Sequence, residues 1–142
     1  MKQPITLLVC QGTGCISSRS DAVYEAFQRE IAALGIENVK VDFTGCHGFC
    51  EQGPNVVIEP EGIFYTHVQV DDVPEIVNSH LRSGIPVERL FYQDPLTGKR
   101  IANYSEINFY AKQQRVILHN CGHINPESIE DYIASGGFRA LR

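Results

Sequence analysis

Four cysteines, placed in two glycine-rich stretches, are the residues of this sequence best suited to chemistry. Cys10 and Cys15 form a C-x4-C pair, and Cys46 and Cys50 form a C-x3-C pair further along the chain. Thiolates bind Zn²⁺ and iron–sulfur clusters, and two neighbouring thiols can also exchange with disulfides. The cysteines therefore indicate a metal site, a cluster site or a redox-active dithiol.

The length and composition of the chain favour a small cytoplasmic protein. Its 142 residues are enough for one ordinary domain or for a domain with an appendage. No apolar stretch reaches the length of a membrane span, and the N-terminal residues do not have the pattern of a secretory signal. Thiols stay reduced in the cytoplasm, so we expect no membrane contact and regard structural disulfides as the least favoured use of the cysteines.

The charge distribution argues against a nucleic-acid partner. Residues 1–85 carry 5 Lys or Arg against 11 Asp or Glu, a formal charge of -6, whereas residues 86–142 carry 7 against 6, or +1. Affinity for nucleic acid depends mainly on clustered basic residues that neutralise phosphates. A protein or small-molecule partner is favoured instead.

The hydrophobic periodicity predicts an α/β fold in the first part of the chain. In chain order we expect a strand, a helix, three strands and a helix, at residues 5–10, 19–34, 38–43, 55–60, 62–68 and 70–84. If the crossover helix makes the first two strands parallel neighbours, both of their C-terminal ends lie at one edge of the sheet. Residues 10–15, the first cysteine loop, and residues 46–50, the second cysteine loop, follow those ends. The four thiols are therefore expected to converge.

The spacing and the glycines favour an iron–sulfur cluster over zinc. Structural zinc sites usually contain a C-x2-C pair, which is absent here, and longer loops can surround a bulkier group. Glycines allow main-chain N–H groups to approach sulfur closely. Those near the cysteines are Gly12, Gly14, Gly45, Gly48 and Gly53. A zinc-stapled interaction domain and a thiol-disulfide oxidoreductase, whose motif is normally C-x-x-C, stay as alternatives.

A family resemblance is carried by VCQGTGCISSRS and by FTGCHGFCEQGPNVVIEPEGIFYTHVQVDDVPEIV. These segments resemble the thioredoxin-like [2Fe-2S] ferredoxin module. The resemblance is to the version that is fused to the N-terminus of the flavin-bearing NADH-oxidising subunit of complex-I-like dehydrogenases and NAD(P)-linked multisubunit hydrogenases. The resemblance covers most of residues 4–85 and implies a thioredoxin-like β-α-β-β-β-α domain over residues 1–85.

The resemblance also implies a cofactor and a role. Cys10 and Cys15 would bind one iron of a [2Fe-2S] cluster, and Cys46 and Cys50 the other. The domain would carry one electron at a time and would contain no catalytic residues of its own. The redox potential and the choice between a hydrogenase and a dehydrogenase parent do not follow from these residues.

Residues 86–142 are expected to be a linker followed by the incomplete start of a flavin-binding domain. A turn is predicted at residues 94–98, and YAKQQRVILHNCGHINPESIEDYIASGGFRAL resembles the start of that domain, with Asn125 as a helix cap and Pro126 in the first turn. By this resemblance FMN, NAD and a [4Fe-4S] cluster would bind beyond this sequence. We expect an arm without its own core, other subunits of a redox complex as partners, and a homodimer as a further option.

Four further residues need an assignment: three lie next to the cysteines in the sequence, and the fourth, Cys121, is far from both loops. His47 is expected to be exposed, and the alternative is that it influences the cluster through a hydrogen bond or its charge. Cys121 is expected to be an ordinary small residue rather than a ligand. Arg19 is either a fixed positive charge beside the first cysteine loop or a solvent-facing residue. Phe49 either shields the sulfurs from water or packs under the second cysteine loop.

Overall fold

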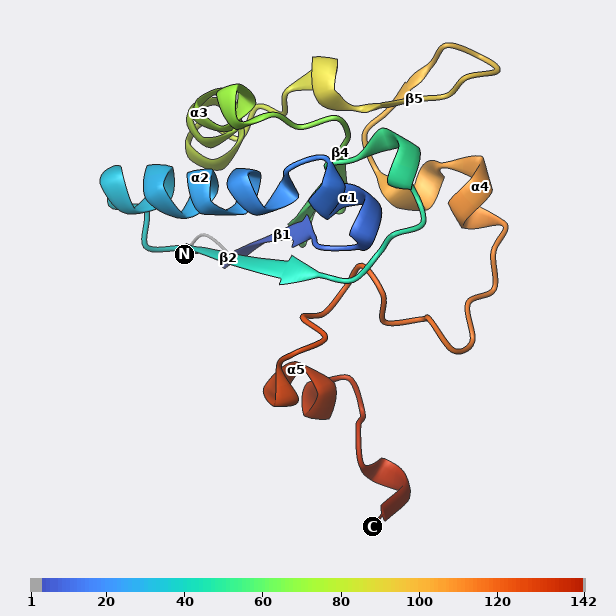
Figure 1. The fold of residues 1–142 in the computed structure, drawn as a ribbon. Coiled ribbons are helices and arrows are strands. Elements are labelled where there is room, and N and C mark those ends of the chain that lie inside the picture. The colour runs from blue at the N-terminus through green and yellow to red at the C-terminus, as the bar shows by residue number, and fades with distance from the viewer. Residues whose placement is uncertain (1–3, 142) are drawn as a thin grey trace.

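A four-stranded mixed sheet forms the centre of the protein, in a computed structural model that describes residues 4–141 (Figure 1). In spatial order the strands are β2 (Val39–Thr44), β1 (Ile5–Cys10), β3 (Val56–Glu59) and β4 (Ile63–Tyr65). β1 and β2 are parallel, whereas β3 pairs antiparallel with both β1 and β4. The predicted α/β class and the parallel arrangement of the first two strands are confirmed.

Helix α2 (Ser20–Ala33) covers one face of the sheet (Figure 1). Val23, Phe27 and Ile31 recur every four residues, which places them on one side of a helix, and all three are buried. Burying a side chain of this size stabilises the fold by about 1.5–3 kcal/mol. The chain turns away after α2 at Gly35, whose φ of +62° is a conformation that glycine adopts without strain.

A second helical segment packs beside α2 on the same face. It runs as a 3₁₀ turn η2 (Val70–Asp72), helix α3 (Val73–Glu75) and a π-helical stretch η3 (Ile76–Arg82). These elements occupy the predicted range 70–84, and their buried side chains join those of α2 and of the sheet in one apolar cluster.

The opposite face of the sheet is covered by the chain that follows η3. Leu8, Val57 and Phe64 alternate with the residues that face α2, because successive side chains of a strand point to opposite faces. Ile101 and Ile107 pack against them and are buried. The protein therefore has a second apolar cluster on this face of the sheet.

Residues 86–111 are not a linker, contrary to the sequence prediction. They include a short hairpin of β5 (Tyr92–Gln93) and β6 (Arg100–Ile101), closed by the predicted turn in which Gly98 N donates to Asp94 O at 2.8 Å. This segment buries the apolar side chains on the second face of the sheet.

Short helices connect and extend these elements. They are α1 (Thr13–Ser17), η1 (Cys50–Gln52), η4 (Glu88–Leu90), η5 (Tyr104–Glu106), α4 (Asn108–Ala111) and η6 (Arg139–Leu141). Within residues 4–141, none of the helices has the length and apolar character needed to cross a bilayer.

Helix α5 (Ile129–Ala134) and the residues after it project away from the sheet (Figure 1). The helix begins later than predicted, because its cap is Ser128, whose Oγ accepts from Asp131 N at 3.1 Å. Asn125 instead donates through its side-chain amide to Asp42 of β2 at 2.7 Å. α5 buries no residue.

Candidate metal centre

The two cysteine loops lie face to face at one edge of the sheet. Cys10 is the last residue of β1 and is paired with Thr44, the last residue of β2. Gln11 N donates to Thr44 O at 2.9 Å, which fixes the starting points of both loops. Because the strands are parallel, both chains leave the sheet on the same side, as the sequence predicts.

Three glycines allow the loops to approach each other closely. A Cβ atom at Gly12 would lie 2.9 Å from Cβ of Cys46, and one at Gly14 would lie 2.9 Å from Cβ of Cys50. A Cβ atom at Gly53 would lie 2.8 Å from the sulfur of Cys15. No side chain fits at these distances, so these glycines are required by the contact between the loops and not by a positive φ.

The four sulfurs form two pairs of different exposure. Cys46 Sγ and Cys50 Sγ are 3.4 Å apart at the surface, while Cys10 and Cys15 are each 1% exposed. The interaction between the Cys10 and Cys15 thiols raises the pKa of Cys10 and lowers the pKa of Cys15. The charges of Cys46 and Cys50 also act on the pKa of Cys15, so the two pairs share one electrostatic environment.

Polar groups of the protein point at two of the sulfurs. Gly48 N donates to Cys46 Sγ at 3.2 Å, and the φ of +90° at Gly48 gives this N–H its direction. The buried side chain of Asn55 donates to Phe49 O at 3.0 Å and, more weakly, to Cys15 Sγ at 3.8 Å. Such donors stabilise thiolates and set the potential of an iron–sulfur centre. The role of Asn55 was not predicted from the sequence.

His47 is buried, contrary to the prediction that it is exposed. Its relative exposure is 1%, because residues 104–123 pack over it. Tyr110 Oη lies 3.2 Å from His47 Nδ1, and Arg115 Nη2 donates to the His47 carbonyl at 2.8 Å. Burial, assisted by the charges of His123 and Arg115, lowers the pKa of His47 to about 4, so its imidazole is neutral at neutral pH.

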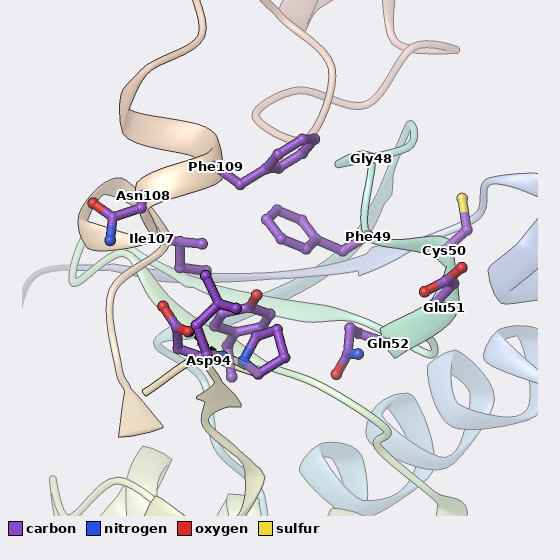
Figure 2. A pocket seen from close by; sticks show the side chains of 12 residues that line it. Gly48, Phe49, Cys50, Glu51, Gln52, Asp94, Ile107, Asn108 and Phe109 are labelled. Atoms are coloured by element: carbon purple, nitrogen blue, oxygen red, sulfur yellow. Dashed lines mark hydrogen bonds between the residues drawn. The ribbon is translucent and has the colours of Figure 1, made fainter. Parts of the chain in front are cut away.

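Phe49 packs under the second cysteine loop. It is 8% exposed and lies 5.3 Å from the Phe64 ring and 5.5 Å from the Tyr92 ring, measured between centroids. Figure 2 shows the rings of Phe49 and Phe109 close together, with their centroids 5.6 Å apart, and both line a hollow of about 540 Å³ that Cys50 also lines. Of the two roles considered for Phe49, the structure supports the packing role.

Comparison with known proteins identifies the family. The family model described as thioredoxin-like [2Fe-2S] ferredoxin matches residues 2–81. The chain belongs to this family. It is 46% identical over 77 residues to a 2Fe-2S ferredoxin of Clostridium pasteurianum, a match that covers 54% of this chain and 76% of that protein. It is 42% identical over 79 residues to a 2Fe-2S ferredoxin of Aquifex aeolicus, covering 54% of this chain and 70% of that protein.

A solved structure agrees with the family assignment. The crystal structure of the wild-type thioredoxin-like [2Fe-2S] ferredoxin from Aquifex aeolicus superposes with a TM-score of 0.58 at 33% sequence identity. The superposition covers 63% of this chain and 96% of that chain. As a thioredoxin-like [2Fe-2S] ferredoxin, the protein is an electron carrier with a [2Fe-2S] cluster.

The residues around the two loops of this ferredoxin fit such a cluster. They supply four free thiols in two pairs, two of them buried, and a main-chain N–H directed at sulfur. Within residues 4–141, no three Cys, His, Asp or Glu side chains are grouped as donors to a single ion. Cys46 Sγ and Cys50 Sγ, 3.4 Å apart, lie close enough together to be two thiolate donors to a single iron.

Two further residues of the ferredoxin were considered from the sequence. Arg19 is exposed and precedes α2 with a φ of 69°, so the solvent-facing alternative holds. Cys121, distant in sequence, lies against the second cysteine loop: its sulfur is 3.7 Å from where a Cβ atom of Gly45 would be. No local pattern in the sequence indicates this proximity, because it depends on how the chain after residue 104 folds back.

Proposed function

We propose that this ferredoxin holds its [2Fe-2S] cluster through Cys10, Cys15, Cys46 and Cys50. The observation that carries the proposal is the mutual packing of the loops: the backbone of each glycine in the first loop faces a cysteine of the second. The 3.4 Å contact between the Cys46 and Cys50 sulfurs supports the assignment of these two residues to one iron, and Cys10 and Cys15 are assigned to the other.

Electrons enter and leave the cluster on the side of Cys46 and Cys50, the more exposed of the two cysteine pairs. When bound, the cluster accepts and releases a single electron. Cys10 and Cys15 are buried in the protein, whereas Cys50 is exposed and Cys46 is half-buried. A partner centre can therefore come closest at the second cysteine loop.

We further propose that the partner is a flavin or another iron–sulfur centre in an NAD(P)H-linked oxidoreductase complex. This part rests on the resemblance of residues 110–141 to the start of a flavin-binding domain. The arm also offers apolar surface to another subunit or to a second copy of the chain, since Ile117 is 90% exposed and Leu141 is 81% exposed. The ferredoxin domain proposed for residues 1–85 would make and break no substrate bonds itself.

Spectroscopy of the anaerobically purified full chain tests the cluster assignment. We expect visible charge-transfer bands that bleach with dithionite, together with two irons and two sulfides per chain. A colourless protein with bound zinc would support the structural staple instead, and a colourless metal-free protein would support thiol-disulfide chemistry. Reduced FMN added to the oxidised protein should bleach the same bands if a flavin can serve as the electron donor.

A further inference from the structure

The segment of residues 110–123 closes over the second cysteine loop, although it lies outside the part of the chain that matches the ferredoxin family. We call it the clamp segment. It contacts the loop through the ring of His47 and through the main chain at the same residue. The site therefore has a wall that the family match does not include.

Arg115 is the centre of this contact. Its Nη1 donates to Tyr110 Oη at 2.8 Å and to the Cys121 carbonyl at 2.9 Å, and its Nη2 donates to the His47 carbonyl at 2.8 Å. The guanidinium carbon also lies 4.5 Å from the centre of the Tyr110 ring. One planar group thus ties the second cysteine loop to both ends of the clamp segment, a geometry for which arginine is better suited than lysine.

The contact reaches a proposed ligand through a single peptide group. The carbonyl of His47 and the N–H of Gly48 belong to the same planar unit, so fixing one fixes the direction of the other. That N–H donates to Cys46 Sγ at 3.2 Å. Arg115 therefore orients the donor of the sulfur, and its positive charge polarises the peptide so that the hydrogen bond to sulfur is strengthened.

The side chain of His47 prevents this peptide from turning. Its ring is enclosed by the rings of Phe64, Tyr104 and Tyr110 at centroid distances of 5.4–5.9 Å. Gly122, with a φ of +92°, lies so close to the ring that a Cβ atom there would overlap it. The peptide is thus held by Arg115 at its carbonyl and by the packed ring on the preceding residue.

We propose that Arg115 is a positioning residue for the [2Fe-2S] cluster, acting through the His47–Gly48 peptide on Cys46. The inference rests on the proposed role of Cys46 as a ligand. A held N–H and a nearby positive charge both favour the more negative reduced cluster, so the clamp segment should raise the reduction potential. It should also slow the loss of the cluster.

The test compares two arginines of the full chain that each bind main-chain carbonyls. Arg115→Gln removes the positive charge and the hydrogen bond from the guanidinium to the His47 carbonyl in the second cysteine loop. Arg100→Gln is the matched control, because Arg100 donates to the carbonyls of Glu88 and Arg89, which lie outside the cysteine loops and the clamp segment. The measurements are the midpoint potential, the EPR spectrum of the reduced protein and the rate of iron release to a chelator.

We expect Arg115→Gln to lower the potential, to change the EPR spectrum and to release iron about 10-fold faster, the usual scale for loss of a group that orients a metal ligand. Arg100→Gln should match the wild type in all three. Arg115→Lys keeps the positive charge but loses the planar guanidinium that binds several acceptors at once. Its potential should therefore lie between those of Arg115→Gln and the wild type, while iron release stays fast. Wild-type potential, spectrum and release rate in Arg115→Gln would overturn the proposal.

A milder variant covers the case in which Arg115→Gln does not fold. Tyr110→Phe keeps the ring that packs on His47 and removes the hydroxyl that accepts from Arg115, so it should shift the potential in the same direction by less. An unchanged potential in this variant would then count against the proposal.

Hydrogen exchange separates a failure of this inference from a failure of the proposed ligands. In the cluster-free full chain, the amides of residues 45–50 should exchange faster in Arg115→Gln than in the wild type. If the wild type binds no two-iron cluster, the proposed function fails, yet the exchange result still reports on the clamp segment. If the wild type binds the cluster and neither readout changes, the clamp inference alone fails.

Discussion

Gly53 lies against the sulfur of Cys15, so that a Cβ atom at residue 53 would be 2.8 Å from Cys15 Sγ and 3.3 Å from the carbonyl oxygen of Cys50. The backbone at Gly53 is extended, with φ −74° and ψ 160°, which any residue adopts without strain. The position therefore excludes a side chain because of where the sulfur lies.

Gly53→Ala should weaken the hold on the cluster. The new methyl group would push Cys15 out of place, and forcing an extra group into a packed site typically costs about 1–3 kcal/mol. We expect iron release to a chelator to be about 10-fold faster than in the wild type, as for other changes next to a metal ligand. The measurement is the decay of the visible absorption under anaerobic conditions.

Gly45→Ala is the matched control for that change. Gly45 belongs to the same site, but the nearest atom to its Cβ position is Cys121 Sγ at 3.7 Å, which is an ordinary contact. This variant should keep the iron content and the release rate of the wild type. If Gly45→Ala and Gly53→Ala released iron equally fast, any added methyl group near the cysteines would weaken cluster binding. The close contact between Gly53 and Cys15 would then not be the cause.

Replacing each cysteine by serine tests the ligand assignment. Serine variants at the proposed ligands should lower the iron bound per chain, and the buried positions Cys10 and Cys15 should be the most damaging, because a serine hydroxyl there must also be desolvated. Cys121→Ser should keep the wild-type iron content, even though Cys121 lies close to the second cysteine loop. Iron loss at Cys121 equal to that at Cys46 or Cys50 would contradict the assignment.

The part of the site that sequence reasoning predicted depends on local pattern. The apolar run ending at Cys10 and the alternating run ending near Thr44 predict two strands, and the helical spacing between them predicts a crossover. Parallel strands joined in this way bring their following loops together by topology alone. The sequence alone therefore predicts that the two cysteine loops lie at the same edge of the sheet.

The residues that surround the cysteines were missed because their roles depend on long-range packing. His47 looks like an exposed loop residue until the chain returns at Tyr110 and Arg115, more than sixty residues later. Asn55 directly precedes β3 and could be a turn residue, and only the fold places its amide beside Cys15. Side-chain partners this far apart leave no periodic pattern in the sequence.

Phe49 is predicted to be a major contributor to the stability of the second cysteine loop. It is 8% exposed and packs against Phe64, Tyr92 and Tyr110, so truncating it leaves a cavity in the second apolar cluster. Phe49→Ala should lower the free energy of unfolding by about 3–5 kcal/mol. Urea unfolding followed by circular dichroism measures the loss.

Leu96→Ala provides the comparison for Phe49→Ala. Leu96 lines the same hollow but is 94% exposed, so its removal should change the free energy of unfolding by about 0.5 kcal/mol or less. A similar loss in both variants would mean that the hollow is closed in solution and that Phe49 is not the residue that supports the loop.

Asp42 joins the C-terminal arm to the sheet and should make that contact sensitive to acid. Its carboxylate accepts from the side chain of Asn125 at 2.7 Å and from Phe43 N at 2.9 Å, and it pairs with Lys40 at 2.7 Å. Burial acts to raise the pKa of Asp42, but the Lys40 ammonium and the two N–H donors outweigh it and hold the pKa below its ordinary value of 3.8. Tyr24 and Asp131 are the other titratable groups nearby.

A depressed pKa means that the folded protein favours the charged carboxylate, so the stability it contributes is complete above the ordinary pKa of 3.8 and is lost as the pH falls through the lower folded value. Asp42→Asn should therefore lower the free energy of unfolding by about 1.5–3 kcal/mol at neutral pH, the range for hydrogen bonds to a charged group, and by less in acid. Urea unfolding at neutral pH and near the folded pKa measures the difference, with Asp71→Asn at an exposed position of η2 as the control. A parallel loss of stability in the wild type and in Asp42→Asn as the pH falls would mean that another carboxylate governs the acid response. The arm would then be held to β2 mainly by the 2.7 Å hydrogen bond from Thr44 Oγ1 to the carbonyl of Ile124.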